Sequence, residues 1–219
     1  MSSKVEKPWD TENYWETRFK EQNTPWDLGE ASPTLIALEK VSKLPANSSI
    51  LFPGCGRGQD PLYFAELGYK VSAVDWSAIA MGDLRVLAKR KTLPMEILKS
   101  SFWEVPDSWD GTFDAIAEHT FFVAIDPLER SRYVEKTSEL LTKKGVLLAS
   151  FFVIPEQKQD SEGWKSLNSS GEGPPFSCTE KEIRKLFSSL YHIEILEPSP
   201  SPRPDPIGKW EWWALFRKK

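Results

Sequence analysis

Three glycines at alternate positions, Gly54, Gly56 and Gly58, form the strongest candidate for a ligand-binding loop in the sequence. They follow an apolar run, residues 49–53, that predicts a buried strand, and they precede a short predicted helix. Glycine lets a backbone approach a ligand closely, and a helix N-terminus offers N–H groups without partners. The dinucleotide fingerprint needs its third glycine at the position of Gln59. The spacing therefore favours a nucleoside-type ligand without a pyrophosphate, such as S-adenosylmethionine, over a dinucleotide; the alternative is a purely structural turn.

A carboxylate stands at the end of the next predicted strand, residues 69–75. Asp75 follows Gly54 by 21 residues, about the spacing at which such folds place an acidic side chain on a ribose hydroxyl pair. The alternative is that Asp75 only caps the helix that begins at Ser77. Because the glycine loop precedes it, we interpret Asp75 as a ribose-binding residue.

Few side chains could act as a general base near neutral pH, because the chain holds only two histidines, His119 and His192. His119 follows a predicted strand, residues 113–118, and so falls at the carboxyl edge of a parallel sheet, where such folds bind ligands. It is a candidate base, or equally a structural residue at a strand end. His192 begins a late strand and is predicted to be structural.

Composition limits the possible partners. The chain has 219 residues, of which 40% are hydrophobic and 27% charged, and its formal net charge is −4. These values predict a single globular domain over residues 1–219 without a membrane span. Mild acidity without a long Lys/Arg run argues against nucleic acid and anionic membranes as partners. Two cysteines are too few for a zinc cluster, so no metal site is expected. Because the start lacks an apolar leader, we expect a cytoplasmic protein, and a monomer.

The elements that must position these residues follow from the hydrophobic patterning. Short apolar runs alternate with longer helical patterns, which is typical of a parallel sheet with crossover helices. Seven strands are predicted, over residues 49–53, 69–75, 95–99, 113–118, 146–153, 191–196 and 209–216. The last two are joined by a Pro-rich connection without a helix, so they should pair antiparallel. We expect an α/β three-layer sandwich with a seven-stranded, mostly parallel sheet whose last strand is antiparallel.

Helix signals fill the gaps between these strands. Trp15 and Phe19 share one face of a first helix, and a later helix should begin at Asp126-Pro127 and reach Lys144, where Gly145 ends it. Residues 155–176 are rich in Gly, Ser, Gln and Pro, which predicts a functional or mobile loop.

Four motifs, in one order along the chain, carry a resemblance to a known family. They are Thr24-Pro-Trp-Asp-Leu-Gly29, Phe52-Pro-Gly-Cys-Gly-Arg-Gly-Gln-Asp60, Phe121-Phe-Val-Ala-Ile-Asp-Pro127 and Gly173-Pro-Pro-Phe176. Over residues 15–176 the sequence resembles the thiopurine S-methyltransferase family, and within it the thiol and halide methyltransferase branch. The resemblance implies the Rossmann-like fold of class I S-adenosylmethionine-dependent methyltransferases, with an N-terminal lid segment over about residues 10–30.

The resemblance also implies roles for single residues. Trp15 and Trp26 match aromatic residues at the methionine end of S-adenosylmethionine, Ser101 and Phe102 match the pair that flanks adenine, and Glu118 lies next to the methyl group. The predicted cofactor-binding set is Trp15, Trp26, Gly54, Gly56, Gly58, Asp60, Asp75, Trp76, Ser101, Phe102 and Glu118. The predicted substrate-binding residues are Trp26, Phe121, Phe122 and Phe176, and the predicted catalytic residues are His119 and Glu118. For Phe121 and Phe122 the alternative is ordinary core packing.

The acceptor stays open, because the position of His119 is Arg in the thiopurine enzymes and Tyr in the halide branch. We expect in-line methyl transfer to a small soft nucleophile: a thiol, sulfide, thiocyanate or halide. Such acceptors need no strong base, and aromatic faces can attract the sulfonium while excluding water. The alternatives are a small-molecule oxygen or nitrogen methyltransferase of the same fold, with Glu118 or His119 as its base, and a binding module for S-adenosylmethionine or a nucleotide without catalysis.

Overall fold

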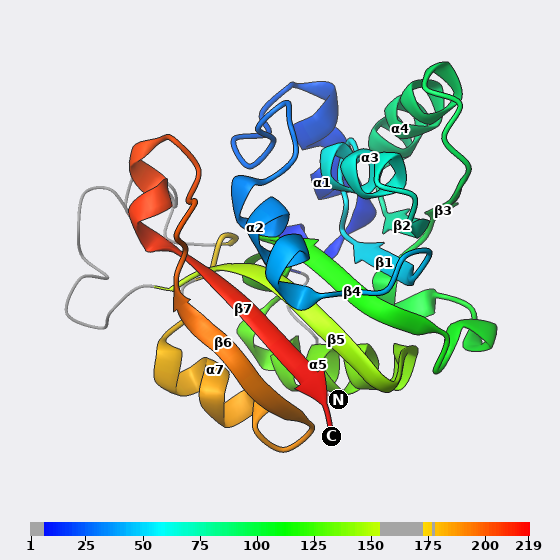
Figure 1. Cartoon of the computed structure of the whole chain (residues 1–219). Coiled ribbons are helices and arrows are strands. Elements are labelled where there is room, and N and C mark those ends of the chain that lie inside the picture. Colours follow the sequence, from blue (N-terminus) through cyan, green and yellow to red (C-terminus); the bar gives the residue numbers. More distant parts are fainter. Residues whose placement is uncertain (1–6, 154–172, 177) are drawn as a thin grey trace.

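The computed structural model describes residues 7–153, 173–176 and 178–219, which form a three-layer arrangement around one seven-stranded sheet (Figure 1). The strands are β1 (Ser49–Pro53), β2 (Lys70–Asp75), β3 (Met95–Lys99), β4 (Phe113–His119), β5 (Leu141–Phe152), β6 (Tyr191–Pro198) and β7 (Glu211–Lys218). Their order across the sheet is β3-β2-β1-β4-β5-β7-β6. Strands β1 to β5 are parallel, whereas β7 is antiparallel to both β5 and β6. The predicted fold class is confirmed.

Helices cover both faces of the sheet. They are α1 (Glu12–Lys20), α2 (Pro33–Ser42), α3 (Gln59–Glu66), α4 (Ala78–Arg90), α5 (Arg130–Leu140) and α7 (Glu180–Phe187). Figure 1 shows α2, α3 and α4 on one side and α5 and α7 on the other, with α1 beside α4. Within the described ranges, none of the helices combines the length and the apolar composition that crossing a bilayer requires.

Side-chain caps start these helices where the sequence changes pattern. Ser32 accepts a hydrogen bond from the Leu35 N–H at 3.4 Å, directly before the Pro that opens α2. Ser77 does the same for Ala80 at the start of α4, and Thr179 with Glu182 forms a capping box on α7. Each cap satisfies N–H groups that would otherwise lack a partner in the first turn of the helix.

Strand β1 illustrates why the sheet is buried on both faces. Ile50 and Phe52 pack with the α2 and α3 side, whereas Leu51 packs with the α5 and α7 side. All three side chains are at most 2% exposed. Apolar residues at consecutive positions are therefore required here, as expected for a central parallel strand.

The helix predicted to reach Lys144 is shorter than expected. Helix α5 ends at Leu140, and Leu141 already pairs with Phe113 of β4 as the first residue of β5. Leu141 is fully buried, so its contribution to the core fixes an extended backbone at that point. The register then shifts before Val146, which leaves Gly145 inside an irregular part of the strand.

The last strand also begins later than predicted. Pro206–Trp210 forms a short 3-10 helix, η7, and β7 starts at Glu211. Pro206 at its first position favours this turn. Of the loop predicted over 155–176, residues 155–172 lie outside the described part of the chain.

Candidate active site

Two cavities lie where the carboxyl ends of β1 and β4 meet the glycine loop. Beyond β1 the sheet continues to β2, and beyond β4 it continues to β5, so this is the point where crossovers leave in opposite directions. Open α/β sheets bind ligands at such a point. The cavities share Trp26, Gly54, Gly56 and His119 in their walls.

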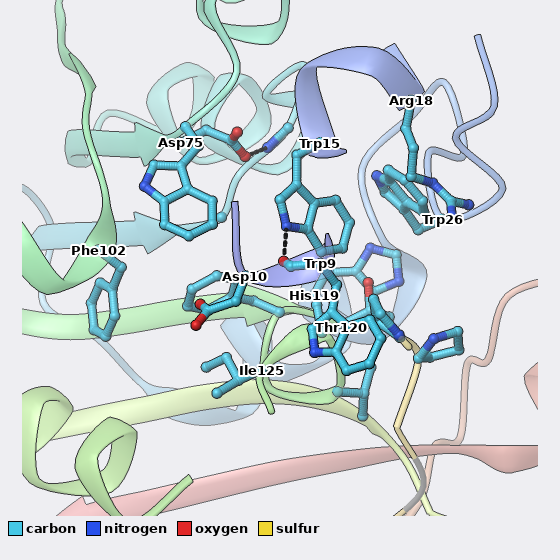
Figure 2. Close-up of a pocket in the computed structure, with 18 of the residues that line it drawn as sticks. Trp9, Asp10, Trp15, Arg18, Trp26, Asp75, Phe102, His119, Thr120 and Ile125 are labelled. Carbon is cyan, nitrogen blue, oxygen red and sulfur yellow. Dashed lines mark hydrogen bonds between the residues drawn. The ribbon is translucent and has the colours of Figure 1, made fainter. Parts of the chain in front are cut away.

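Most predicted site residues meet at the larger cavity, which Figure 2 shows. The predicted residues in its wall are Trp15, Trp26, Gly54, Gly56, Asp75, Trp76, Ser101, Phe102, His119 and Phe121. In this view Asp75 and Phe102 lie at one end, and Arg18, Trp26 and His119 lie at the other. Gly58, Asp60 and Glu118 instead line the smaller cavity.

The glycine loop has a backbone that requires its glycines. Gly54, Gly56 and Gly58 have φ values of +56°, +54° and +80°, a region that residues with a Cβ rarely adopt. A Cβ on Gly54 would lie 2.1 Å from the Phe121 ring. The Gly56 N–H donates to Asp75 Oδ2 at 2.9 Å, so the loop is tied to the end of β2.

The Asp75 carboxylate binds both the glycine loop and the residues that lead from β2 into α4. Besides Gly56 it accepts a hydrogen bond on Oδ1 from the Ser77 N–H at 2.9 Å, next to the start of α4. Burial raises the pKa of the Asp75 carboxyl, and the backbone N–H groups act in the opposite direction. A carboxylate can accept about four hydrogen bonds. Asp75 thus supports the cap region and keeps capacity to accept bonds from sugar hydroxyls.

Beside Asp75 the wall is largely aromatic. Ser101 Oγ accepts the Trp103 N–H at 3.2 Å and so starts the 3-10 turn η2 (Phe102–Glu104). Phe102 is 5% exposed and packs edge-on against Phe121, with ring centroids 5.6 Å apart. Trp76 adds a half-buried indole to the same wall. This end can take a planar base.

Aromatic side chains of the N-terminal segment cover the opposite end. Trp15 donates from Nε1 to the Trp9 carbonyl at 2.9 Å and meets Trp26 edge-on at 5.6 Å. The Arg18 guanidinium lies 4.8 Å from the Trp26 ring centroid. Glu16, on the same helix, accepts a hydrogen bond from Ser77 Oγ at 2.6 Å. Helix α1 is therefore docked onto the start of α4.

Glu118 supports the turn after β4. Its Oε2 accepts the Phe121 N–H at 2.7 Å and the Phe122 N–H at 3.4 Å. The residue is 1% exposed, and its Oε1 has no hydrogen-bond partner among the described residues. Burial raises the pKa of this carboxyl to about 8. The carboxylate faces the turn that carries Phe121 and the smaller cavity.

His119 lies between two carboxylates. Nδ1 is 3.8 Å from Asp60 Oδ2, and Nε2 is 4.0 Å from Glu211 Oε1. The His119 side chain is 10% exposed, and Nε2 is sealed from solvent without a hydrogen-bond partner in the described chain. These two carboxylates come from α3 and β7, on either side of the β4 end.

The two consecutive phenylalanines after β4, Phe121 and Phe122, lie in different surroundings. Phe121 lies in the cavity wall, whereas Phe122 is fully buried against Tyr133, Phe151 and Phe187 and is a core residue. Phe176 is in neither cavity wall; it packs edge-on against Trp9 at 5.6 Å, and its N–H donates to the Val123 carbonyl. Phe176 therefore backs the cavity through Trp9.

The cavity residues that were not predicted include Trp9 and Arg203. Arg203 belongs to the Pro-rich connection between β6 and β7, and its side chain is 4% exposed. It donates to Asp205 Oδ2 at 2.7 Å and to the Pro25 carbonyl at 2.9 Å. Gly208 permits this packing, since a Cβ there would lie 2.1 Å from the Arg203 carbonyl oxygen. The chain has ten tryptophans, and the gathering of several of them near its two ends was the one sequence signal for Trp9. No local pattern marks Arg203.

The fold and this site define a class I S-adenosylmethionine-dependent methyltransferase: a seven-stranded sheet with β7 antiparallel, a glycine loop after β1 and a carboxylate at the end of β2. The chain belongs to the thiopurine S-methyltransferase family, because residues 10–207 match the family described as Thiopurine S-methyltransferase (TPMT). Both the predicted family and the predicted enzyme class are confirmed.

Curated relatives agree with this membership. The chain is 30% identical over 210 residues to a protein of Arabidopsis thaliana named "Probable thiol methyltransferase 2", with 92% of this chain and 86% of the relative covered. It is 31% identical to "Thiocyanate methyltransferase 1" of the same plant, over 91% of this chain and 85% of the relative. A "Thiopurine S-methyltransferase" of Xanthomonas campestris is 26% identical, over 89% and 93%.

Solved structures share the fold. A Burkholderia thailandensis 1,6-didemethyltoxoflavin-N1-methyltransferase with bound S-adenosylhomocysteine matches with a TM-score of 0.73, 18% identity, and coverage of 100% of this chain and 93% of that one. Magnesium protoporphyrin IX methyltransferase from Synechocystis PCC 6803, with bound S-adenosylmethionine, matches with a TM-score of 0.69 and 12% identity over the full length of both chains. The ligands of these two proteins agree with the prediction of S-adenosylmethionine as the cofactor.

Proposed function

We propose that the larger cavity binds S-adenosylmethionine with its nucleoside at the Asp75 end. Asp75 would accept hydrogen bonds from the ribose hydroxyls, and Ser101, Phe102 and Trp76 would enclose the adenine. Two observations support this placement: the Gly54 and Gly56 backbone lies in the cavity wall without side chains, and Asp75 keeps acceptor capacity beside it. When bound, the cofactor supplies a methyl group on a positively charged sulfur.

The methionine end of the cofactor would then lie under Trp15 and Trp26. Indole faces attract a positive charge and exclude water. Their edge-on packing and the bond from Trp15 to the Trp9 carbonyl set the positions of the two rings relative to each other. Removal of water strengthens the reaction of a positively charged donor with an electron-rich acceptor.

We propose that the acceptor is a small, soft, anionic or ionisable nucleophile: a thiol, sulfide, thiocyanate or halide. The observation that carries this proposal is Arg203, a buried guanidinium in a cavity wall that is otherwise rich in Trp, Phe and Pro. Asp205 and the Pro25 carbonyl take hydrogen bonds from Nε and Nη2 of this guanidinium, and its remaining N–H donors favour a small anion over a neutral alcohol or amine. The names of the plant relatives, thiol and thiocyanate methyltransferase, support the same acceptor class.

An acceptor panel with methyl-labelled S-adenosylmethionine tests the proposal. An aliphatic thiol, an aromatic thiol, sulfide, thiocyanate and iodide are compared with a catechol and a primary amine. We expect label to reach sulfur or iodide. Transfer only to the catechol or the amine would contradict the acceptor class and favour an oxygen or nitrogen methyltransferase.

A substitution at Arg203 tests the role of the cation. In Arg203→Met, KM for thiocyanate should rise about 10- to 100-fold, the scale of a lost hydrogen bond to a charged group. Arg203→Lys should retain part of the affinity, because it keeps the charge without the planar fork. Arg217→Met removes an arginine that pairs with Glu194 at the far end of β7, and it controls for loss of a cation. Unchanged KM in Arg203→Met at unchanged cofactor affinity would exclude Arg203 from the acceptor site.

We further propose that the enzyme acts as a cytoplasmic monomer on free small molecules, without nucleic acid or membrane partners. The net charge of −4 and the free thiols of Cys55 and Cys178 support this proposal. Light scattering after gel filtration should give one chain per particle.

A further inference from the structure

The two carboxylates beside His119 differ in what they can do. Glu211 is closed off from solvent, with a side chain that is 0% exposed. Its Oε1 accepts a hydrogen bond from Ser150 Oγ at 2.7 Å, and its Oε2 accepts one from the backbone N–H of Arg203 at 2.6 Å. Glu211 Oε1 lies 4.0 Å from Nε2, beyond hydrogen-bond distance, and the sealed carboxylate has no exit for a proton. Its negative charge favours the histidine tautomer with hydrogen on Nε2, which leaves the lone pair on Nδ1.

Asp60, unlike Glu211, is partly accessible to solvent. Its Oδ1 accepts the Ser32 N–H at 2.7 Å, which fixes the carboxyl group, while Oδ2 faces His119 Nδ1 at 3.8 Å. Asp60 lines the smaller cavity, and its side chain is 15% exposed. The gap to Nδ1 is about 1 Å longer than a hydrogen bond, as catalytic contacts often are before a ligand binds.

The smaller cavity is a route by which a proton can leave the site of the methyl acceptor. Its volume is about 50 Å³, room for water, which needs about 10–15 Å³ on this measure. His119 is the one ionisable side chain common to both cavity walls, and the smaller cavity is also lined by Glu30 and by Asp27, which pairs with Arg57 at 3.4 Å. Glu30 is exposed, so this polar space reaches the protein surface.

We propose that His119 and Asp60 form a proton exit: Nδ1 of His119 takes the proton of a thiol acceptor, and Asp60 passes it to water in the smaller cavity. The proposal rests on the proposed function. Methylation of a thiol forms a carbon–sulfur bond on the acceptor, breaks the methyl–sulfur bond of the donor sulfonium, and releases one proton. That proton moves from the thiol to Nδ1; after the thioether has formed, the imidazolium ring turns its Nδ1–H to Asp60 Oδ2, 3.8 Å away in this structure, and Asp60 passes the proton to bulk water. The negative charge of Glu211, 4.0 Å from Nε2, favours hydrogen on that nitrogen throughout.

Burial raises the pKa of the Asp60 carboxyl, with the His119 charge acting in the opposite direction. A carboxylate that is a stronger base than usual accepts a proton from an imidazolium at a smaller cost in free energy. His119 is faced by Asp60 from α3 and by Glu211 from β7, and Glu118 precedes it on β4. Of the two carboxylates that face the ring, Asp60 is the one that also lines a cavity.

Iodide provides the decisive comparison, because its methylation releases no proton. Asp60→Asn keeps an oxygen for the Ser32 N–H but cannot relay a proton. In this variant we expect kcat for a thiol to fall at least about 10-fold more than kcat for iodide, within the range for a lost proton-transfer group. The solvent deuterium isotope effect on thiol methylation should increase. The KM for each acceptor should change far less than kcat.

Asp114→Asn is the matched control. Asp114 also accepts a backbone N–H, that of Ser49 at 2.9 Å, but it lies near the start of β4, away from both cavities. This substitution should change kcat for the thiol and kcat for iodide by the same factor. His119→Gln is a second variant that does not depend on the folding of Asp60→Asn, and it should show the same preference for iodide.

Because the two groups act in series, Asp60→Asn should add almost nothing in the His119→Gln background. The proton exit is wrong if Asp60→Asn and His119→Gln each lower thiol and iodide turnover by the same factor, or lower neither. It is also wrong if their effects on thiol turnover simply multiply. Failure of the wild-type enzyme to methylate either acceptor would instead overturn the proposed function, and the proton exit with it.

Discussion

The guanidinium of Arg57 lies 5.1 Å from the ring centroid of Phe19 and donates from Nη2 to the Phe19 carbonyl at 3.2 Å. Arg57 stands between Gly56 and Gly58 in the glycine loop, whereas Phe19 belongs to α1 in the N-terminal segment. The same guanidinium also reaches Thr24 Oγ1 at 3.3 Å and Asp27 Oδ2 at 3.4 Å. One side chain thus joins the loop that would hold the cofactor to the segment that covers it.

Removing this link should make the N-terminal segment more mobile and weaken binding of the cofactor. In Arg57→Met we expect the dissociation constant of S-adenosylmethionine to rise about 10-fold, which corresponds to about 1.4 kcal/mol. Hydrogen exchange over residues 19–29 should be faster without ligand and should slow when the cofactor binds. Arg90→Met, at the exposed end of α4, controls for loss of a surface arginine. Full protection of residues 19–29 in unliganded wild-type protein would show that they do not act as a lid.

Asp75 should be required for recognition of the ribose. Asp75→Ala should weaken binding of S-adenosylmethionine by about 1.5–3 kcal/mol, the range for hydrogen bonds to a charged group, and NAD should not bind to either protein. Calorimetry with S-adenosylhomocysteine and an analogue without ribose hydroxyls separates this role from support of the loop through Gly56. The wild type should prefer the hydroxylated ligand, and the variant should lose that preference. An equal preference in both proteins would exclude the ribose contact.

The parts of the site that the sequence predicted are those built from neighbouring residues. The glycine loop, the strand end at Asp75 and its helix cap at Ser77 are adjacent elements, so spacing alone relates them. The alternation of strands and helices predicted the layers, and the helix-free connection before β7 predicted that this strand is antiparallel, for the same reason. Local pattern failed where burial decided the outcome: Leu141 is a core residue, and β5 therefore begins where a helix was predicted to continue.

Contacts between distant segments could not be predicted from spacing. Arg203 reaches the cavity because β7 lies between β5 and β6 in the sheet and Gly208 lets the preceding chain pack closely. Glu211 faces His119 for the same topological reason, since the first residue of β7 pairs with Phe152 next to the end of β4. The sequence identified His119 as a candidate base and Asp60 as a cofactor-binding residue, but no spacing indicated that Asp60 and Glu211 lie on either side of the His119 ring.

The contact between Gly54 and Phe121 predicts a specific rescue. Gly54→Ala places a Cβ 2.1 Å from the Phe121 ring and forces a side chain into a backbone with φ of +56°, so cofactor affinity should fall by more than about 10-fold. Phe121→Ala in the same chain removes the clash and should restore part of the loss, leaving about 1–2 kcal/mol of backbone strain.

Gly82→Ala is the control for this pair. Gly82 lies inside α4, and a Cβ at this position would point into open space, with no side chain within 4 Å. Alanine there should therefore stabilise the protein by about 0.5–1 kcal/mol in thermal unfolding. If the double variant binds cofactor no better than Gly54→Ala, the ring contact is not the cause of the loss.

Glu118 should make the stability of the protein depend on pH. Burial raises the pKa of its carboxyl from 4.5 to about 8 in the folded state. Between these values the folded protein keeps a proton that the unfolded chain releases, so the free energy of unfolding falls as pH rises through that range. The loss should approach the order of 4 kcal/mol at pH 8.

In Glu118→Gln the amide oxygen can still accept the Phe121 N–H, but there is no carboxyl to ionise. The variant should therefore lose this pH dependence and be more stable than the wild type at pH 8, with little difference near pH 5. Urea unfolding at several pH values measures the effect, and Glu135→Gln at an exposed position on α5 controls for the removal of one carboxyl group. Parallel pH profiles for the wild type and Glu118→Gln would mean that Glu118 stays ionised in the folded protein, because the N–H groups of the turn after β4 then outweigh the cost of burying its charge.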